Sequence, residues 1–139
     1  MKNKLSIIFL LLFANLSNAQ SVRQKDKYGE LVVYVDGTTL RAKNIYGNPL
    51  FYFDGQVIKR KDKYGEVLYS LDGNTIRAKD KYGDALFYFD GEVVKQKDRY
   101  GESLYYLDGN VLKHKDKYGS PAYYFEGIPE KWVITCLIR

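Results

Sequence analysis

The sequence predicts an all-β protein, an antiparallel meander of six 18-residue β-hairpin repeats that curls or closes into a barrel, flower or propeller-like form. A Tyr-Gly pair and an Asp-Gly pair alternate along the chain without insertion or deletion. The segments between them are rich in Tyr, Phe, Val and Leu, residues typical of strands. A fixed period of this kind marks a repeat architecture. Tyr-Gly stands at 28–29, 46–47, 64–65, 82–83, 100–101 and 118–119, and Asp-Gly at 36–37, 54–55, 72–73, 90–91 and 108–109, with Glu126-Gly127 in the sixth place.

Residues 1–19 are predicted to be a signal peptide. Lys2 and Lys4 precede the apolar run 5–13, which is short for a membrane span, and small residues lead to Ala19. Cleavage is expected after Ala19, which would make the mature protein periplasmic or secreted, without a membrane span. The alternative is a short N-terminal anchor.

Charge and cysteine content narrow the classes of function. The formal net charge of +5 falls to +3 when the two lysines of the signal peptide are removed (5 − 2), and the remaining charges are interleaved. This pattern does not predict nucleic acid as a partner. Cys136 is the single cysteine, so no disulfide can form within the chain. We expect a buried, inert thiol; the alternative is an intermolecular disulfide.

Two kinds of turn define each repeat. Asp-Gly between apolar runs predicts a type I′ hairpin, in which Leu107 would face Asn110 and Tyr106 would face Val111. Asp-Lys-Tyr-Gly, as at 62–65, predicts a type I turn followed by a bulge, with its glycine left-handed. A parallel β-solenoid has a similar period, but it does not need two tight turns in each coil.

Alternation along the strands separates two faces of the sheet. One face is apolar in every copy and is the predicted core, and the other carries a Tyr, an aliphatic residue and a Lys or Arg. The core set is Tyr105, Leu107 and Leu112, with counterparts Phe87, Phe89 and Val94; Tyr69, Leu71 and Ile76; Phe51, Phe53 and Ile58; and Val33, Val35 and Leu40. An open sheet would expose this face and two edges, so we expect the first strand, near Val22, to pair with the last, 122–125, and close a ring.

The domain boundaries follow from these patterns. The repeat domain covers residues 20–127, and residues 128–139 are expected to form a C-terminal cap strand. Trp132–Ile138 is apolar throughout, which suggests a strand buried on both faces. It would cap or plug the repeat array; the alternative is a docking strand for a partner.

The unit Asp-x-Tyr-Gly, followed by an aromatic strand and Asp-Gly, resembles the four-fold β-flower proteins, in which short strand–turn–strand units are arranged radially. The resemblance covers about Ser21 to Gly127 and implies a closed all-β fold. The six copies here differ from a four-fold design. Choline-binding repeats and tryptophan-glycine repeats are also similar. The former depend on tryptophans that these repeats lack, and the latter have a different glycine spacing, so no choline site is carried over.

No residue pattern predicts catalysis. The one histidine, His114, occupies a position filled by other residue types in the other copies, and the carboxylates stand at turns. We expect no enzyme, cofactor or metal, with a hydrolase as a distant third function. The five Asp-Gly aspartates could gather around an axis and hold a cation, but turn capping explains each of them.

The repeated Tyr and Lys or Arg residues of the outer face are the candidate ligand site. Aromatic rings beside cations suit sugar rings or acidic polymers. We expect a structural or interaction scaffold at the cell envelope; the alternative is a glycan-binding module. The partner would be a surface glycan or an envelope protein, and the oligomeric state is not predicted. The candidate residues are Tyr34, Tyr52, Tyr88, Tyr106, Tyr124, Arg41, Lys59, Lys95 and Lys113.

Overall fold

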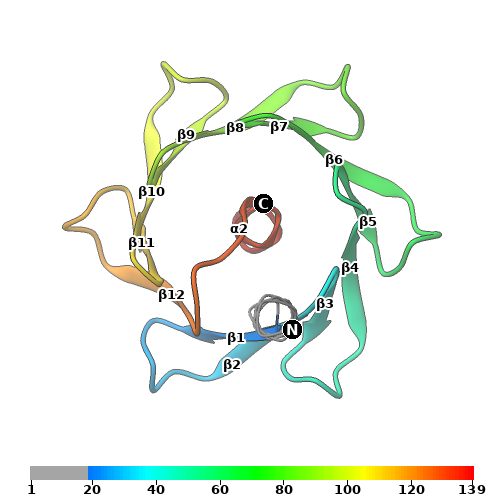
Figure 1. Cartoon of the computed structure of the whole chain (residues 1–139). Helices are drawn as coiled ribbons and strands as arrows, with labels where there is room; N and C mark the ends of the chain where they lie inside the picture. Colours follow the sequence, from blue (N-terminus) through cyan, green and yellow to red (C-terminus); the bar gives the residue numbers. More distant parts are fainter. Residues whose placement is uncertain (1–18) are drawn as a thin grey trace, which may run out of the picture.

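The computed structural model describes residues 19–139, so the predicted signal peptide lies outside the described residues except for Ala19. The chain forms twelve strands followed by one helix (Figure 1). They are β1 (Ala19–Gln24), β2 (Leu31–Asp36), β3 (Thr39–Ala42), β4 (Pro49–Phe53), β5 (Val57–Arg60), β6 (Val67–Asp72), β7 (Thr75–Ala78), β8 (Ala85–Asp90), β9 (Val93–Gln96), β10 (Ser103–Asp108), β11 (Val111–His114), β12 (Pro121–Phe125) and α2 (Lys131–Ile138). Between residues 19 and 139, no helix has the length and apolar character needed to cross a membrane.

The strands close into a single antiparallel barrel, which confirms the predicted fold class. Each strand pairs with its neighbours in sequence, and β1 pairs with β12 through Val22 opposite Phe125 and Arg23 opposite Tyr124. Glu126 strengthens this junction, because its carboxylate accepts a hydrogen bond of 2.8 Å from the Ser21 amide. The predicted ring closure is therefore confirmed, and no strand edge is left unpaired in the barrel.

The Asp-Gly hairpins have a different register from the predicted one. Asp108 pairs with Val111 and Leu107 with Leu112, so the two-residue loop is Gly109-Asn110. Gly109 has a φ of 64°, and Asn110 does not have a positive φ, which corresponds to a type II′ turn rather than type I′. The loop moves by one residue, so each cross-strand partner moves by two. A shift of two keeps every side chain on its predicted face.

The Tyr-Gly connections form six outward-pointing petals (Figure 1). In the first petal, Lys25 has a φ of 61°, and the Asp26 amide donates to the Gln24 carbonyl at 2.7 Å, which makes a γ-turn. The left-handed residue is thus the lysine, whereas the glycine was expected. Gly29 is needed for another reason: a Cβ there would lie 1.7 Å from the Gln24 carbonyl oxygen. All six petals also carry a bulge, which bends the hairpin away from the barrel wall.

The apolar face lies inside the barrel, as predicted. Every repeat contributes aliphatic or aromatic side chains to this interior. The third repeat differs on the outer face, where Ser70 replaces the Tyr of the other copies and is buried. The buried apolar residues of the strands are Val22, Val33, Val35, Leu40, Phe51, Ile58, Ile76, Phe89, Val94, Leu112 and Phe125.

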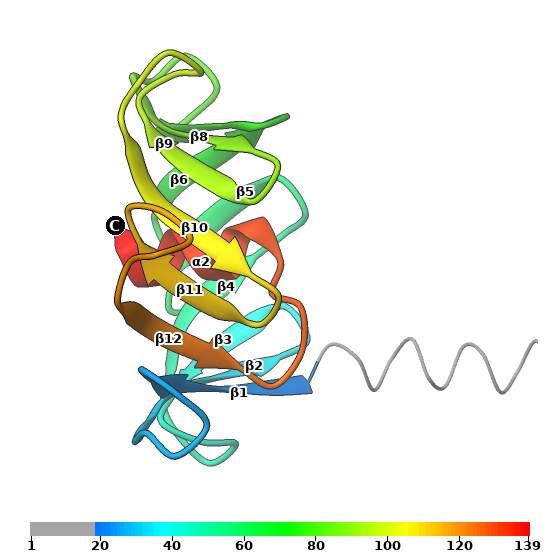
Figure 2. The ribbon, with the colours of Figure 1, turned by 90° about the vertical axis from the view of Figure 1, so that its left-hand side faces the viewer.

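The C-terminal segment is a helix, so the predicted cap strand is wrong. α2 runs through the centre of the barrel (Figures 1 and 2), and five successive residues, Trp132–Cys136, are buried. A short apolar run does not reveal by its periodicity whether it is a strand or a buried helix. A strand inside a closed barrel would have no partner for its backbone amides and carbonyls, whereas a helix satisfies most of them internally.

Contacts fix α2 at both ends of the barrel. At the Asp-Gly end, the Trp132 ring stacks on Phe53 with centroids 5.3 Å apart, and Lys131 donates to the Asn74 side chain at 2.6 Å. At the Tyr-Gly end, the Arg139 guanidinium lies 4.5 Å from the Phe51 ring centroid. The helix therefore fills the barrel. This agrees with the expectation that the segment would plug the repeat array.

We expect Trp132→Ala to lower the free energy of unfolding by about 3–5 kcal/mol, because it leaves a cavity where the buried ring packs against Phe53. The measurement is urea unfolding followed by far-UV circular dichroism. Ile128→Ala is the control, since Ile128 is 69% exposed and should leave stability nearly unchanged. Equal stability of both variants would contradict the role of α2 as part of the core.

Candidate functional site

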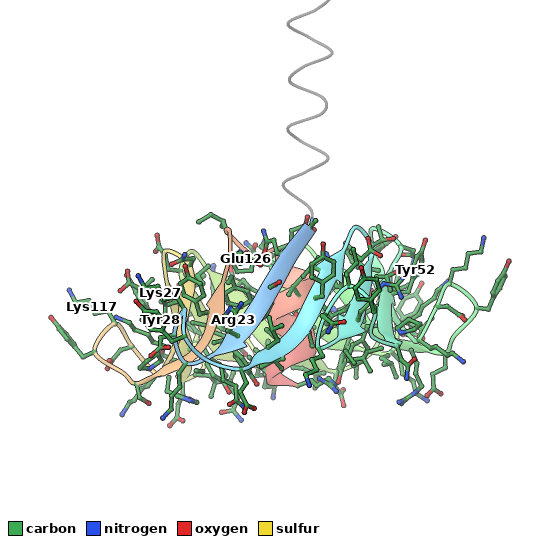
Figure 3. All side chains as sticks on the ribbon, turned by 90° about the horizontal axis from the view of Figure 1, so that it is seen from below. Arg23, Lys27, Tyr28, Tyr52, Lys117 and Glu126 are labelled. Atoms are coloured by element: carbon green, nitrogen blue, oxygen red, sulfur yellow. The ribbon has the colours of Figure 1, made fainter. Side chains whose placement is uncertain are left out.

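The outer face of the barrel carries the predicted Tyr and cation residues as direct cross-strand partners. This geometry follows from the shifted hairpin register, and it brings each ring closer to its cation than the predicted register would. The pairs are Tyr34–Arg41, Tyr52–Lys59, Tyr88–Lys95 and Tyr106–Lys113. At the closing junction Tyr124 pairs with Arg23, a residue that the site prediction missed although Val22-Arg23 aligns with Leu40-Arg41 in the repeat. Figure 3 labels Tyr52 and Arg23 on this face. All five tyrosines are half-buried.

The Lys and Arg side chains of this face form hydrogen bonds and ion pairs with other groups of the protein. Lys95 donates to Asp90 at 2.9 Å and to the Arg99 carbonyl at 3.0 Å, so it links an Asp-Gly turn to a petal. Arg41 does the same through Asp36 at 3.0 Å and the Gly47 carbonyl at 3.3 Å. The equivalent ion pairs are Lys59–Asp54 at 3.8 Å, Arg77–Asp72 at 3.2 Å and Lys113–Asp108 at 2.8 Å. These side chains brace the barrel wall, and their donors are largely occupied.

The same contacts place the Asp-Gly aspartates. Four of them accept hydrogen bonds from the cation of their own hairpin. Asp54 instead accepts from the amides of Gln56 and Val57, at 3.0 and 2.9 Å, and these backbone bonds lower its pKa. The hypothetical ring of aspartates around an axis is thus wrong, because each carboxylate is held at its own turn on the wall.

A second set of tyrosines, at the petal tips, is the most exposed apolar feature of the described chain. Five are 80–85% exposed and Tyr46 is 92% exposed. In five petals the preceding residue is a cation that lies over the ring, with Lys or Arg 4.9–5.3 Å from the centroid. Figure 3 labels Tyr28 and Lys27 next to each other and shows Lys117 at the outer margin of the molecule. We call Tyr28, Tyr46, Tyr64, Tyr82, Tyr100 and Tyr118 the tip tyrosines.

Sequence reasoning missed the tip tyrosines, although the signal was present. The Tyr of Tyr-Gly was considered only as part of a turn motif. A turn between two strands lies on the surface, so a large ring that recurs in it cannot belong to the core.

The backbone at each tip tyrosine is held by hydrogen bonds within the turn. The Tyr28 amide donates to the Asp26 carboxylate at 2.9 Å, and the Gly29 amide to the Asp26 carbonyl at 3.0 Å. The same Asx contact, also at 2.9 Å, supports the tyrosine of each other petal, with Asn44 replacing the aspartate in the second. The tips therefore present their rings from a defined backbone.

The two ends of the barrel have open hollows rather than deep cavities. At the Tyr-Gly end, Tyr105, His114, Gln24 and Tyr123 line a hollow of about 320 Å³, in which the rings of His114 and Tyr105 lie 5.4 Å apart. At the Asp-Gly end, Tyr52 and Trp132 line one of about 280 Å³. Residues 19–139 contain no group of three or more His, Cys, Asp or Glu side chains arranged to hold a metal ion.

Cys136 is buried in α2, which confirms its predicted burial. Burial of the thiolate in the apolar core raises the pKa of the thiol to about 12, and the nearby Arg139 opposes part of this effect. Because the reactive form is the thiolate, this thiol is unreactive while the protein is folded.

We expect the thiol of Cys136 to resist alkylation by iodoacetamide at a pH near the ordinary thiol pKa of about 8.5, and to react fully in concentrated urea. Mass spectrometry measures the modified fraction. In a Cys136→Ser background, Ile128→Cys supplies an exposed thiol that should react in the folded protein. Rapid modification of native Cys136 would show that α2 leaves the barrel readily.

The bracing role of the outer cations is tested by a double-mutant cycle of Asp90→Asn and Lys95→Met. We expect a coupling free energy of about 0.2–1 kcal/mol in urea unfolding, since the pair is partly exposed. Salt should reduce it. A coupling of zero would remove the structural explanation for these cations and favour a role in ligand binding.

Comparison with known proteins identifies the fold family. The family described as 6-fold beta flower protein matches residues 14–112, well over half of the 139-residue chain. No curated protein and no solved structure matches the chain. The chain belongs to the 6-fold beta flower protein family, which agrees with its six petals and replaces the four-fold symmetry of the resemblance noted in the sequence.

Proposed function

For a six-fold β-flower protein with a filled interior, we propose a non-catalytic role as a multivalent interaction scaffold at the cell envelope. The observation that carries this proposal is the distribution of surface chemistry. The barrel axis is occupied by α2, whereas exposed tyrosine rings recur in equivalent positions on six petals, and a cation lies over the ring in five of them. A repeated outer surface serves a repeated or extended partner better than a single small molecule.

Export is part of this proposal. Its support is the charged start, the short apolar run and the small residues before Ala19. The single cysteine is free and buried, so the fold does not depend on a disulfide in either redox environment.

Glycan binding through the strand tyrosines is less favoured as the mode of action. The cations beside them are engaged by turn aspartates and petal carbonyls, and the rings are half-buried. The petal tips are free of these constraints and are the better interaction surface.

The experiment blocks whole petals without assuming the chemistry of the partner. Single, double and triple combinations of Glu30→Cys, Asp84→Cys and Glu102→Cys, each exposed next to a petal glycine, are coupled to a bulky polyethylene glycol maleimide. The buried thiol of Cys136 does not compete. Binding of the mature protein to an envelope fraction of its own cells is then measured.

We expect apparent affinity to fall with each blocked petal, by on the order of 100-fold for three, whichever petals are chosen. Glu92→Cys, which is exposed at an Asp-Gly turn, is the matched control and should bind normally when coupled. Full binding after three petals are blocked would contradict a petal-based scaffold, and complete loss after one particular petal would indicate a single site.

A further inference from the structure

We propose that the tip tyrosines, together with the cations that lie over them, bind a linear acidic polysaccharide, a polymer of sugar rings that carry carboxylate groups. This inference rests on the proposed scaffold function and names the chemical class of its partner. It shifts the predicted glycan site from the strand tyrosines to the petal tips.

The first argument is that stability does not explain the tip tyrosines. A single exposed aromatic residue on a protein surface needs no explanation. Here six rings are 80–92% exposed at equivalent positions, so each of them contributes little to the core. Tyr is also not required by the turn, because the turn uses only the tyrosine's backbone amide.

The second argument is the chemistry of the pair. An aromatic ring offers a flat apolar face to the C–H groups of a sugar ring, and a neighbouring cation adds a charge-assisted contact to a carboxylate. The Lys81 ammonium lies 5.3 Å from the Tyr82 centroid, and Arg99 donates to the Tyr100 hydroxyl at 2.7 Å. The cation therefore lies over one face of the ring, within reach of a carboxylate on a sugar that stacks on the opposite face.

The third argument concerns rigidity and repetition. The γ-turn, the Asx contact and the close glycine hold each tip before the ligand arrives, which reduces the entropy lost on binding. Individual contacts at such exposed positions are weak. Six of them around one rim allow a long polymer to engage several tips at once.

The charge pattern distinguishes this site from a general polyanion site. The fourth petal carries Lys79 and Lys81 but also Asp80 and Asp84, so its net charge is zero. Charge alone does not drive binding, and sugar stacking must contribute. We therefore expect binding to weaken at high salt without disappearing.

The second petal supplies an internal control. Ile45 replaces the cation there, and Tyr46 is the most exposed of the tip tyrosines. Ile45→Lys should complete this platform, and Lys81→Ile should remove the cation from the fourth petal. The double variant has the net charge of the wild type, so it separates the number of complete platforms from total charge.

The test measures binding of the mature protein by biolayer interferometry to immobilised polygalacturonate. The comparison polymers are its methyl-esterified form, which keeps the sugar backbone, and poly-glutamate, which keeps the charge without sugar rings. We expect the strongest binding to polygalacturonate. Ile45→Lys should raise its affinity about two- to fivefold and Lys81→Ile should lower it by a similar factor, while the double variant should bind like the wild type.

Loss of the rings is the decisive variant. Tyr28→Ser, Tyr64→Ser and Tyr82→Ser combined should lower the affinity for polygalacturonate by on the order of 100-fold with little change in unfolding temperature, because these rings are more than 80% exposed. Ile128→Ser is the control for removal of an exposed apolar side chain. Equal binding to poly-glutamate, or binding to anionic phospholipid vesicles with no binding to polygalacturonate, would overturn the proposal.

The two proposals fail in different ways. If coupling polyethylene glycol to the petals reduces envelope binding but the triple Tyr→Ser variant binds the envelope normally, the scaffold stands and the polysaccharide assignment is wrong. If petal blocking has no effect on envelope binding, both are wrong.

Discussion

The pairing of β1 with β12 is the contact on which the rest of the structure depends. It joins the two ends of the repeat array, so strands from opposite ends of the array pair there as the two strands of each Asp-Gly hairpin do elsewhere. Only a closed ring has an interior, and only an interior can bury α2 on all sides. The outward direction of the petals follows as well, because the wall is continuous and each bulged hairpin can bend only away from it.

Repetition explains why the fold was largely predictable. A constant period located every turn. The array begins and ends with single strands, near Val22 and at 122–125, that can pair with each other, and this predicted closure. Two errors have physical causes. Asp108 pairs with Val111 as the last strand residue, and Gly109 begins the loop because a type II′ turn favours glycine at its first central position. The run Trp132–Ile138 predicts a strand because it is apolar throughout, whereas the closed barrel leaves no backbone partner for a strand and the segment forms a helix.

The candidate site was predictable in part. The strand pattern correctly brought Tyr88 and Lys95 to one face, but it could not show that the lysine is held by Asp90 and the Arg99 carbonyl. Such contacts depend on the exact register and on the neighbouring petal. The tip tyrosines were visible as a repeated residue, yet their exposure becomes evident only once the turn is recognised as the outermost part of each repeat.

The order of elements along the chain also determines when the protein can fold. The strand that closes the ring and the helix that fills it come after the other eleven strands along the chain. A chain emerging from the ribosome therefore holds ten or eleven strands of an open sheet whose apolar face has nothing to cover it. Such a chain is exposed to aggregation until β12 and α2 have emerged. Completion is then concerted, since closure and filling each require the other.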